Sequence, residues 1–248
     1  MSLLAFRQVS KRFPDGNREI VVLDRVSFEV EVGETVGLLC SRRDGKTTLL
    51  RVAAGLTVPD EGKVLWEDRD LTEMSRDDRA RARRECGVAV VQGDSRIERS
   101  LPVLAHVAHG LYSSGLTMTK AEKRAMQALE CLEATNLATW STTELGVGER
   151  LTVELARAIV REPRLLLVDE PAVLPQPADA RAFYALLRSL PERLGCALLI
   201  ASEEVAPLRG CKPMMSLGGG RLSSTTSRRK VIDFPSAQAG GSSRGNAS

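Results

Sequence analysis

Short apolar segments alternate along this chain with longer segments of helical spacing. The apolar segments are rich in Val, Leu and Ile, and turn residues such as Pro14, Asp15 and Gly16 separate the first two, which is typical of strands. The predicted strands cover residues 3–9, 20–32, 35–39, 63–66, 87–91, 165–168 and 197–201. Residues 47–55 have the pattern of a helix that ends at Gly55.

The spacing changes between the fifth and sixth predicted strands, where apolar residues stand three and four positions apart over residues 101–159. Strands interleaved with helices favour a mostly parallel α/β sheet. We therefore expect one α/β domain over residues 1–222, with an antiparallel β lobe at its start and a helical insertion at about 93–160. Residues 223–248 are rich in Ser, Gly, Arg and Ala, and this composition predicts a disordered tail.

Composition narrows the classes of function that the chain can serve. A chain of 248 residues, 43% of them hydrophobic, can form one large core, and its net charge of +3 is too small to favour a nucleic-acid partner. The five cysteines form no CxxC pair, which indicates neither a disulfide framework nor a zinc site and fits a reducing cytosol. No run approaches the roughly 20 apolar residues of a membrane span, so we expect neither a span nor a secretory signal.

A phosphate-binding loop is predicted where the strand at 35–39 ends. It consists of Cys40, Ser41, Arg42, Arg43, Asp44, Gly45, Lys46, Thr47 and Thr48. The loop matches G-x-x-x-x-G-K-[ST] except that Cys40 replaces the first glycine. Because it follows a strand and opens a helix, its backbone N–H groups should bind phosphate. Lys46 should add positive charge, and Thr47 should hold Mg²⁺.

One side chain of this loop opposes phosphate binding. Asp44 places a carboxylate where phosphate should lie, and at roughly 5 Å with an effective dielectric near 20 the repulsion is about 3 kcal/mol, or about a hundredfold in affinity. Arg42 or Arg43 would neutralise part of this charge. The alternative interpretation is a loop that holds no nucleotide.

Two carboxylates, Asp169 and Glu170, follow the apolar strand at 165–168. The carboxyl ends of parallel strands are where α/β sheets bind ligands, so this pair is a candidate metal and catalytic site. A core strand that ends in a solvated acidic turn is the alternative, and the phosphate loop earlier in the chain favours the site.

Together these segments resemble the ATP-binding subunits of ABC transporters over residues 3–222. The strand before Asp169 and Glu170 is similar to the family's Walker B motif, and residues 145–149, Leu-Gly-Val-Gly-Glu, are similar to its signature LSGGE. Residues 79–92 resemble the macrolide-exporter and lipoprotein-release type. The resemblance implies a P-loop NTPase core of RecA-like type, with ATP and Mg²⁺ as ligands.

The resemblance also implies roles for the matching residues. Asp169 and Thr47 would hold Mg²⁺ with Gln92, which also links the site to a membrane partner, and Glu170 would polarise the attacking water. Phe13 stands where an aromatic ring stacks on adenine, with a core position in the β lobe as an equal alternative. The signature residues that would contact the nucleotide of the other subunit are Gly146, Val147, Gly148 and Glu149.

Several positions depart from the family's pattern. Arg43 replaces a loop glycine, Gly146 replaces the signature serine and Val147 replaces a signature glycine. Residues 173–176 lack the aspartate of the family's D-loop, and Glu203 stands in place of the switch histidine. Loss of a positioned proton-handling or charge-stabilising group typically reduces a rate by about 10²–10⁴, so we expect weak hydrolysis or none.

The resemblance implies two kinds of protein partner, a second ATPase subunit in the family's head-to-tail dimer and a membrane permease. A homodimer would repeat every departure in both sites, so a heterodimer with a complete ATPase is favoured. A membrane permease would dock near residues 92–111 and hold the chain at the cytoplasmic face of the cell membrane. The alternatives are a scaffold without nucleotide and a regulatory subunit that acts on a non-transporting membrane protein.

The chain has two histidines, His106 and His109, three positions apart. A pair on the surface of a helix is favoured for them over a metal site.

Overall fold

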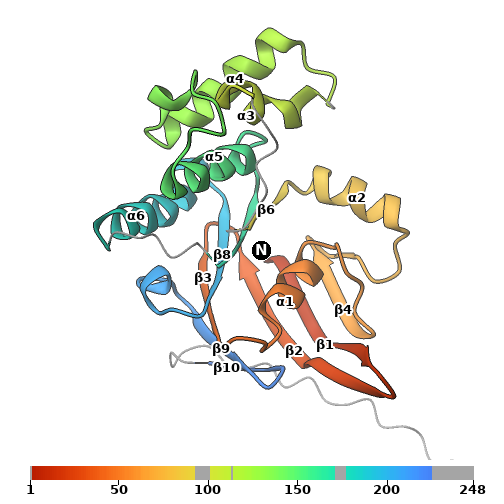
Figure 1. The fold of residues 1–248 in the computed structure, drawn as a ribbon. Coiled ribbons are helices and arrows are strands. Elements are labelled where there is room, and N and C mark those ends of the chain that lie inside the picture. Colours follow the sequence, from red (N-terminus) through yellow and green to blue (C-terminus); the bar gives the residue numbers. More distant parts are fainter. Residues whose placement is uncertain (1, 93–100, 113, 171–176, 225–248) are drawn as a thin grey trace, which may run out of the picture.

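The computed structural model describes residues 2–92, 101–112, 114–170 and 177–224, which form two sheets and the helices around them (Figure 1). The strands are β1 (Ser2–Asp15), β2 (Arg18–Glu31), β3 (Thr35–Cys40), β4 (Glu61–Trp66), β5 (Arg69–Asp70), β6 (Val88–Gln92), β7 (Leu165–Asp169), β8 (Ala197–Ser202), β9 (Met214–Gly218) and β10 (Arg221–Ser224). The helices are α1 (Lys46–Ala53), α2 (Arg76–Glu85), α3 (Val103–Tyr112), α4 (Met118–Cys131), α5 (Val147–Ile159) and α6 (Pro177–Leu194), with 3₁₀ turns η1 (Thr135–Leu137) and η2 (Ala206–Leu208).

The larger sheet has the strand order β10-β9-β3-β8-β7-β6, and all of its strand pairs are parallel except β9 with β10. Every residue of β7 and β8 is buried, which is why both strands read as uninterrupted apolar runs in the sequence. The smaller sheet, ordered β2-β1-β4-β5, is antiparallel. The predicted α/β class, with a mostly parallel sheet and an antiparallel β lobe, is confirmed.

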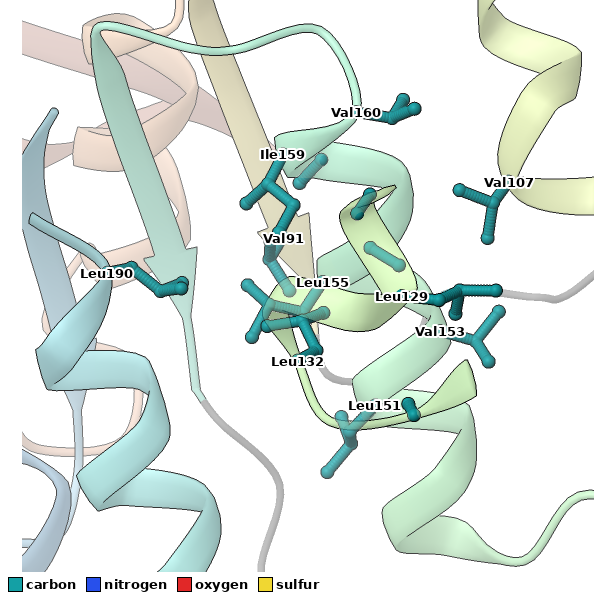
Figure 2. Close-up of a cluster of buried hydrophobic side chains, with 14 of the residues drawn as sticks. Val91, Val107, Leu129, Leu132, Leu151, Val153, Leu155, Ile159, Val160 and Leu190 are labelled. Atoms are coloured by element: carbon teal, nitrogen blue, oxygen red, sulfur yellow. The ribbon is translucent and has the colours of Figure 1, made fainter. Parts of the chain in front are cut away.

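The helices α3, α4 and α5 lie between β6 and β7 in the sequence, and Figure 1 places α3 and α4 at the end of the molecule away from the antiparallel sheet. One buried apolar cluster joins them to the parallel sheet (Figure 2). It combines Val107 of α3, Leu129 of α4 and Leu155 of α5 with Val91 of β6 and Leu190 of α6. The helical segment is therefore packed onto the sheet through its own core residues.

A second apolar cluster joins the antiparallel lobe to α1 and to the other face of the parallel sheet. Trp66 of β4 is fully buried in it and donates its indole N–H to the carbonyl of Ala53 at 2.9 Å. Gly55, just after α1, has φ of +63°, and a Cβ there would lie 2.9 Å from the Trp66 ring. The end of α1 is thus fixed against the β lobe, and with it the direction of the helix that begins at the phosphate loop.

Several elements were not predicted from the sequence. The segment of α2, RDDRARARRE, buries only Ala82, so it has no apolar stripe to reveal a helix, although Ser75 caps its first turn. The strand β10 includes Ser223 and Ser224, two residues beyond the expected end of the domain at 222. The rest of the predicted tail, 225–248, lies outside the described residues. Among the helices that are described, none is long and apolar enough to span a bilayer.

The contact between Gly55 and Trp66 gives a test of this packing. Gly55→Ala should lower the free energy of unfolding by about 2–4 kcal/mol, since it combines left-handed backbone strain with overlap against a buried ring. Gly195→Ala is the matched control, because Gly195 has φ of +67° and open space around a Cβ, and it should lose only about 1–2 kcal/mol. Urea denaturation of both variants measures the difference, and equal losses would contradict the described packing.

Candidate functional site

Three segments with polar residues meet at the carboxyl ends of β3, β7 and β8. Parallel pairing sets Leu39 beside Ser202 and Asp169 beside Ala201. The loop after β3, the carboxylates after β7 and the residues after β8 therefore lie at one edge of the sheet. This is the edge at which open α/β sheets bind ligands.

The loop after β3 is closed around the carboxylate of Asp44. Asp44 Oδ2 accepts a hydrogen bond from the backbone N–H of Ser41 at 3.0 Å, and Oδ1 accepts one from Gly219 N–H at 3.5 Å. Gly45 has φ of +95°, and a Cβ there would lie 2.7 Å from the Val22 carbonyl oxygen, so only glycine fits. An amide that a phosphate-binding loop would offer to its ligand is thus bound by the loop's own side chain.

The other replacements in the loop are accommodated in different ways. The side chain of Cys40 is buried, and burial raises the pKa of its thiol to about 12, so it packs as an apolar group. Arg43 adopts a left-handed conformation with φ of +71°, which costs a non-glycine residue about 1–2 kcal/mol. Arg42 and Arg43 are both exposed, and within the described part of the chain neither forms an ion pair with Asp44.

Lys46 forms an ion pair with each of two carboxylates. Its Nζ donates to Glu170 Oε2 and lies 3.4 Å from Glu203 Oε1. Burial alone would lower the pKa of Lys46, but the hydrogen bond and the attraction of Glu170 outweigh it, so the net shift is upward. The ammonium is therefore charged and already paired.

Glu170 is held through both of its carboxylate oxygens. Its Oε1 accepts from the hydroxyl of Ser202 at 3.1 Å, and its Oε2 accepts from the backbone N–H of Glu203 at 3.0 Å in addition to Lys46. Ser202 is fully buried and was not identified from the sequence. The one signal that could have found it is a hydroxyl residue at the end of an apolar strand, next to the strand that carries the acidic pair.

Asp169 and Thr47 form the part of the site that suits a cation. The hydroxyl of Thr47 donates to Asp169 Oδ2 at 2.8 Å, whereas Asp169 Oδ1 is buried and has no hydrogen-bond partner among the described residues. Burial raises the pKa of Asp169, against the opposing effects of the Thr47 hydrogen bond and the Lys46 charge. A hydroxyl and a carboxylate with an unsatisfied oxygen are ligands that suit Mg²⁺, directly or through water.

Two predicted site residues lie at the margins of this arrangement. The backbone of Gln92 pairs with Asp169 between β6 and β7, while its side chain lies outside the described set. Phe13 is 41% exposed on β1, with Lys11 Nζ 5.4 Å from its ring centroid. The alternative of a core phenylalanine is therefore wrong, and stacking on adenine stays a prediction.

The predicted signature residues form the start of α5. Gly146 precedes the helix and donates its N–H to Glu149 Oε2 at 2.7 Å, and Val147 is 49% exposed. The first turn of α5 thus presents a β-branched side chain to solvent. Contact with a nucleotide on another subunit stays a prediction, and residues 173–176 lie outside the described parts of the chain.

The two histidines do not form a surface pair. His106 is 4% exposed, with Nε2 3.4 Å from Glu154 Oε1, while His109 is exposed and packs edge-on against Tyr112. The expectation of a surface pair is therefore wrong for His106. Over the described ranges, there is no group of three or more His, Cys, Asp or Glu residues placed so that it could hold a metal ion.

Comparison of the sequence with known proteins gives one consistent family. The ABC transporter family model matches residues 23–173. The chain is 31% identical to the methionine import ATP-binding protein MetN of Myxococcus xanthus, over 95% of this chain and 71% of that protein. It is also 31% identical to the lipopolysaccharide export system ATP-binding protein LptB of Acidithiobacillus ferridurans, over 92% of each. Neither name is of the macrolide-exporter or lipoprotein-release type, so that assignment stays a prediction.

Comparison of the structure agrees at the level of the fold. The chain is similar to the ATP-binding cassette MJ0796 in a dimeric post-hydrolysis state bound to ADP and Pi, with a TM-score of 0.80 and 22% identity over 91% of this chain and all of the other. It is also similar to cbiO1 from Clostridium perfringens, part of the ABC transporter complex cbiONQ, with a TM-score of 0.79 and 24% identity over 90% of this chain and 87% of the other.

The burial of Asp169 predicts a dependence of stability on pH. A carboxyl whose pKa rises on folding stabilises the protein below its unfolded pKa, and this contribution is lost as pH rises through the folded pKa. Asp169→Asn removes the titration, so its free energy of unfolding relative to wild type should increase as pH rises above about 4, the ordinary pKa of an aspartate.

Urea denaturation in EDTA at several pH values measures this difference without a divalent cation. Asp77→Asn, which removes an exposed carboxyl from α2, is the control and should show no comparable trend. A difference between Asp169→Asn and wild type that stays constant with pH would mean that Asp169 is not destabilised by burial.

Proposed function

Because this chain belongs to the ABC transporter family, we propose that it is the ATP-binding subunit of a transport complex that binds MgATP weakly and hydrolyses it poorly or not at all. The observation that carries the proposal is the pairing of the phosphate loop with the chain's own carboxylates. The carboxylate of Asp44 accepts a hydrogen bond from the backbone N–H of Ser41, and Lys46 forms ion pairs with Glu170 and Glu203.

Weak binding follows from what a nucleotide must displace. The Ser41 amide and the Lys46 ammonium are groups that a P-loop offers to phosphate. A triphosphate would have to break the hydrogen bond to Asp44 and the ion pairs of Lys46, and would then lie close to the released carboxylates. In ligand-bound form, Thr47 and Asp169 would hold Mg²⁺, which would neutralise part of the phosphate charge.

Poor hydrolysis follows from the surroundings of Glu170. A general base must be available to the water that it orients, but Glu170 accepts hydrogen bonds from Ser202 and Glu203 and pairs with Lys46. Glu203 stands in place of the family's switch histidine, which could donate a hydrogen bond or a proton to phosphate, whereas a carboxylate could not. It therefore adds repulsion in place of a stabilising contact.

A heterodimer with a complete ATPase and a permease at the cytoplasmic face of the membrane completes the proposal. Closure of such a dimer would transmit a conformational change to the permease. The exposed Val147 at the start of α5 supports a heterodimer, because a homodimer would present this side chain to both nucleotides. The named relatives include one import protein and one export protein, which fits a direction of transport set by the membrane subunit.

A scaffold that binds no nucleotide is the second candidate, and the bond between Asp44 and Ser41 favours it as well, since the loop is satisfied without a ligand. Calorimetric titration separates the two candidates. Wild type should bind MgATP weakly, Lys46→Ala should abolish binding, and Asp44→Ser should tighten it by about a hundredfold, because one repulsive charge is removed.

Asp77→Ser, which removes a carboxylate from the exposed face of α2, is the control and should leave the affinity unchanged. No heat from wild type with binding restored in Asp44→Ser would favour the scaffold. Binding that persists unchanged in Lys46→Ala would place the nucleotide outside this loop and overturn the proposal.

The altered signature predicts the behaviour of the isolated chain in solution. Sedimentation velocity at micromolar concentration should show a monomer with and without MgATP, because Val147 stands where close backbone approach to phosphate is needed. Turnover measured by phosphate release should lie about 10²–10⁴ below that of a complete family member. A homodimer that forms only with ATP and turns it over at ordinary rates would contradict the heterodimer.

A further inference from the structure

We propose that Glu203 determines the nucleotide specificity of this site and makes it favour a nucleoside diphosphate over the corresponding triphosphate. The inference rests on the proposed function, in that it requires nucleotide to bind in the loop after β3. It goes beyond that function by assigning to one side chain a discrimination between two ligands that differ by a single phosphoryl group.

The position of Glu203 is fixed relative to Lys46. Its backbone N–H donates to Glu170 Oε2 at 3.0 Å, and its Oε1 lies 3.4 Å from Lys46 Nζ. The lysine of a P-loop reaches the β- and γ-phosphates, while the loop amides hold the α- and β-phosphates. Glu203 is therefore within ion-pair distance of the ammonium that a γ-phosphate has to reach.

The two unusual carboxylates of the site act on different parts of a nucleotide. Asp44 binds the Ser41 amide, in the part of the loop that serves phosphates present in both ADP and ATP. It should weaken both nucleotides by a similar factor. Glu203 lies at the lysine end of the site, so its repulsion acts most strongly on the ligand that carries a third phosphate.

The size of the discrimination follows from one additional charge. A third phosphoryl group adds roughly one negative charge, and two like charges at roughly 5 Å with an effective dielectric near 20 correspond to about a hundredfold in affinity. The Glu203 side chain is 39% exposed, and solvent screening reduces this factor. We therefore expect Glu203 to change the ratio of the two affinities by about tenfold. This is enough for the diphosphate to bind at least as tightly as the triphosphate.

The second acidic residue after β8 provides a matched control. Glu204 is exposed and follows Glu203 directly, and its backbone N–H donates to Ser202 Oγ at 3.0 Å. Among the described ion pairs, those of Lys46 involve Glu170 and Glu203. Glu204→Gln thus removes the same charge from the same turn without removing a partner of the ammonium.

Calorimetric titration of the full chain with MgADP, MgATP and a magnesium complex of a non-hydrolysable ATP analogue tests the proposal. Wild type should bind ADP at least as tightly as ATP or the analogue. Glu203→Gln should shift the ratio of the two dissociation constants toward triphosphate by about tenfold, with a smaller change in affinity for ADP than for ATP. Glu204→Gln should shift the ratio less than about threefold.

The outcomes separate this inference from the proposed function. If both nucleotides bind and the ratio in Glu203→Gln stays within about twofold of wild type, or Glu204→Gln shifts it equally, the inference is wrong and nucleotide binding stands. If wild type binds neither ligand, the comparison is made in an Asp44→Ser background, where the same ratios are expected. Absence of binding there as well would overturn both the inference and the proposed function.

Discussion

The ammonium of Lys46 has to be neutralised, and the rest of the site is arranged around that requirement. A phosphate loop gathers backbone N–H groups, a helix N-terminus and a lysine in one place, and this concentration of positive charge attracts anions. In this chain the anions are its own side chains. Glu170 and Glu203 form ion pairs with Lys46, and Asp44 accepts a hydrogen bond from the backbone N–H of Ser41. Parallel pairing of β3, β7 and β8 brings these groups together from distant parts of the sequence.

The same arrangement divides the site into two parts with different character. The cation part is formed by Thr47 and by Asp169, whose buried Oδ1 has no partner among the described residues. Its hydroxyl and carboxylate are ligands that suit Mg²⁺. In the phosphate part, the chain's own carboxylates already bind the amide and the lysine. The proposal of a subunit that binds nucleotide weakly and turns it over slowly rests on this difference.

Sequence reasoning predicted the elements that carry the site because they are buried on both faces. The strands β3, β7 and β8 appear as apolar runs, and the residues that follow them are polar. The partner of Asp44 was not foreseen, since Arg42 or Arg43 was expected to neutralise its charge, whereas the carboxylate accepts a hydrogen bond from the backbone N–H of Ser41. The helix α2 was not predicted either, because ten largely charged residues with one buried alanine carry no periodicity. The role of Ser202 depends on the register between β8 and its neighbours, which a single sequence does not contain.

The most direct test of the central claim is the exchange rate of the Ser41 backbone amide in the ligand-free protein, measured by NMR. If the carboxylate of Asp44 holds this N–H, exchange with solvent deuterium should be slow in wild type and at least about tenfold faster in Asp44→Ala, because exchange requires the hydrogen bond to open. Equal rates in the two proteins would show that the loop amide is not bound by its own side chain, and the account of a self-satisfied phosphate loop would be wrong.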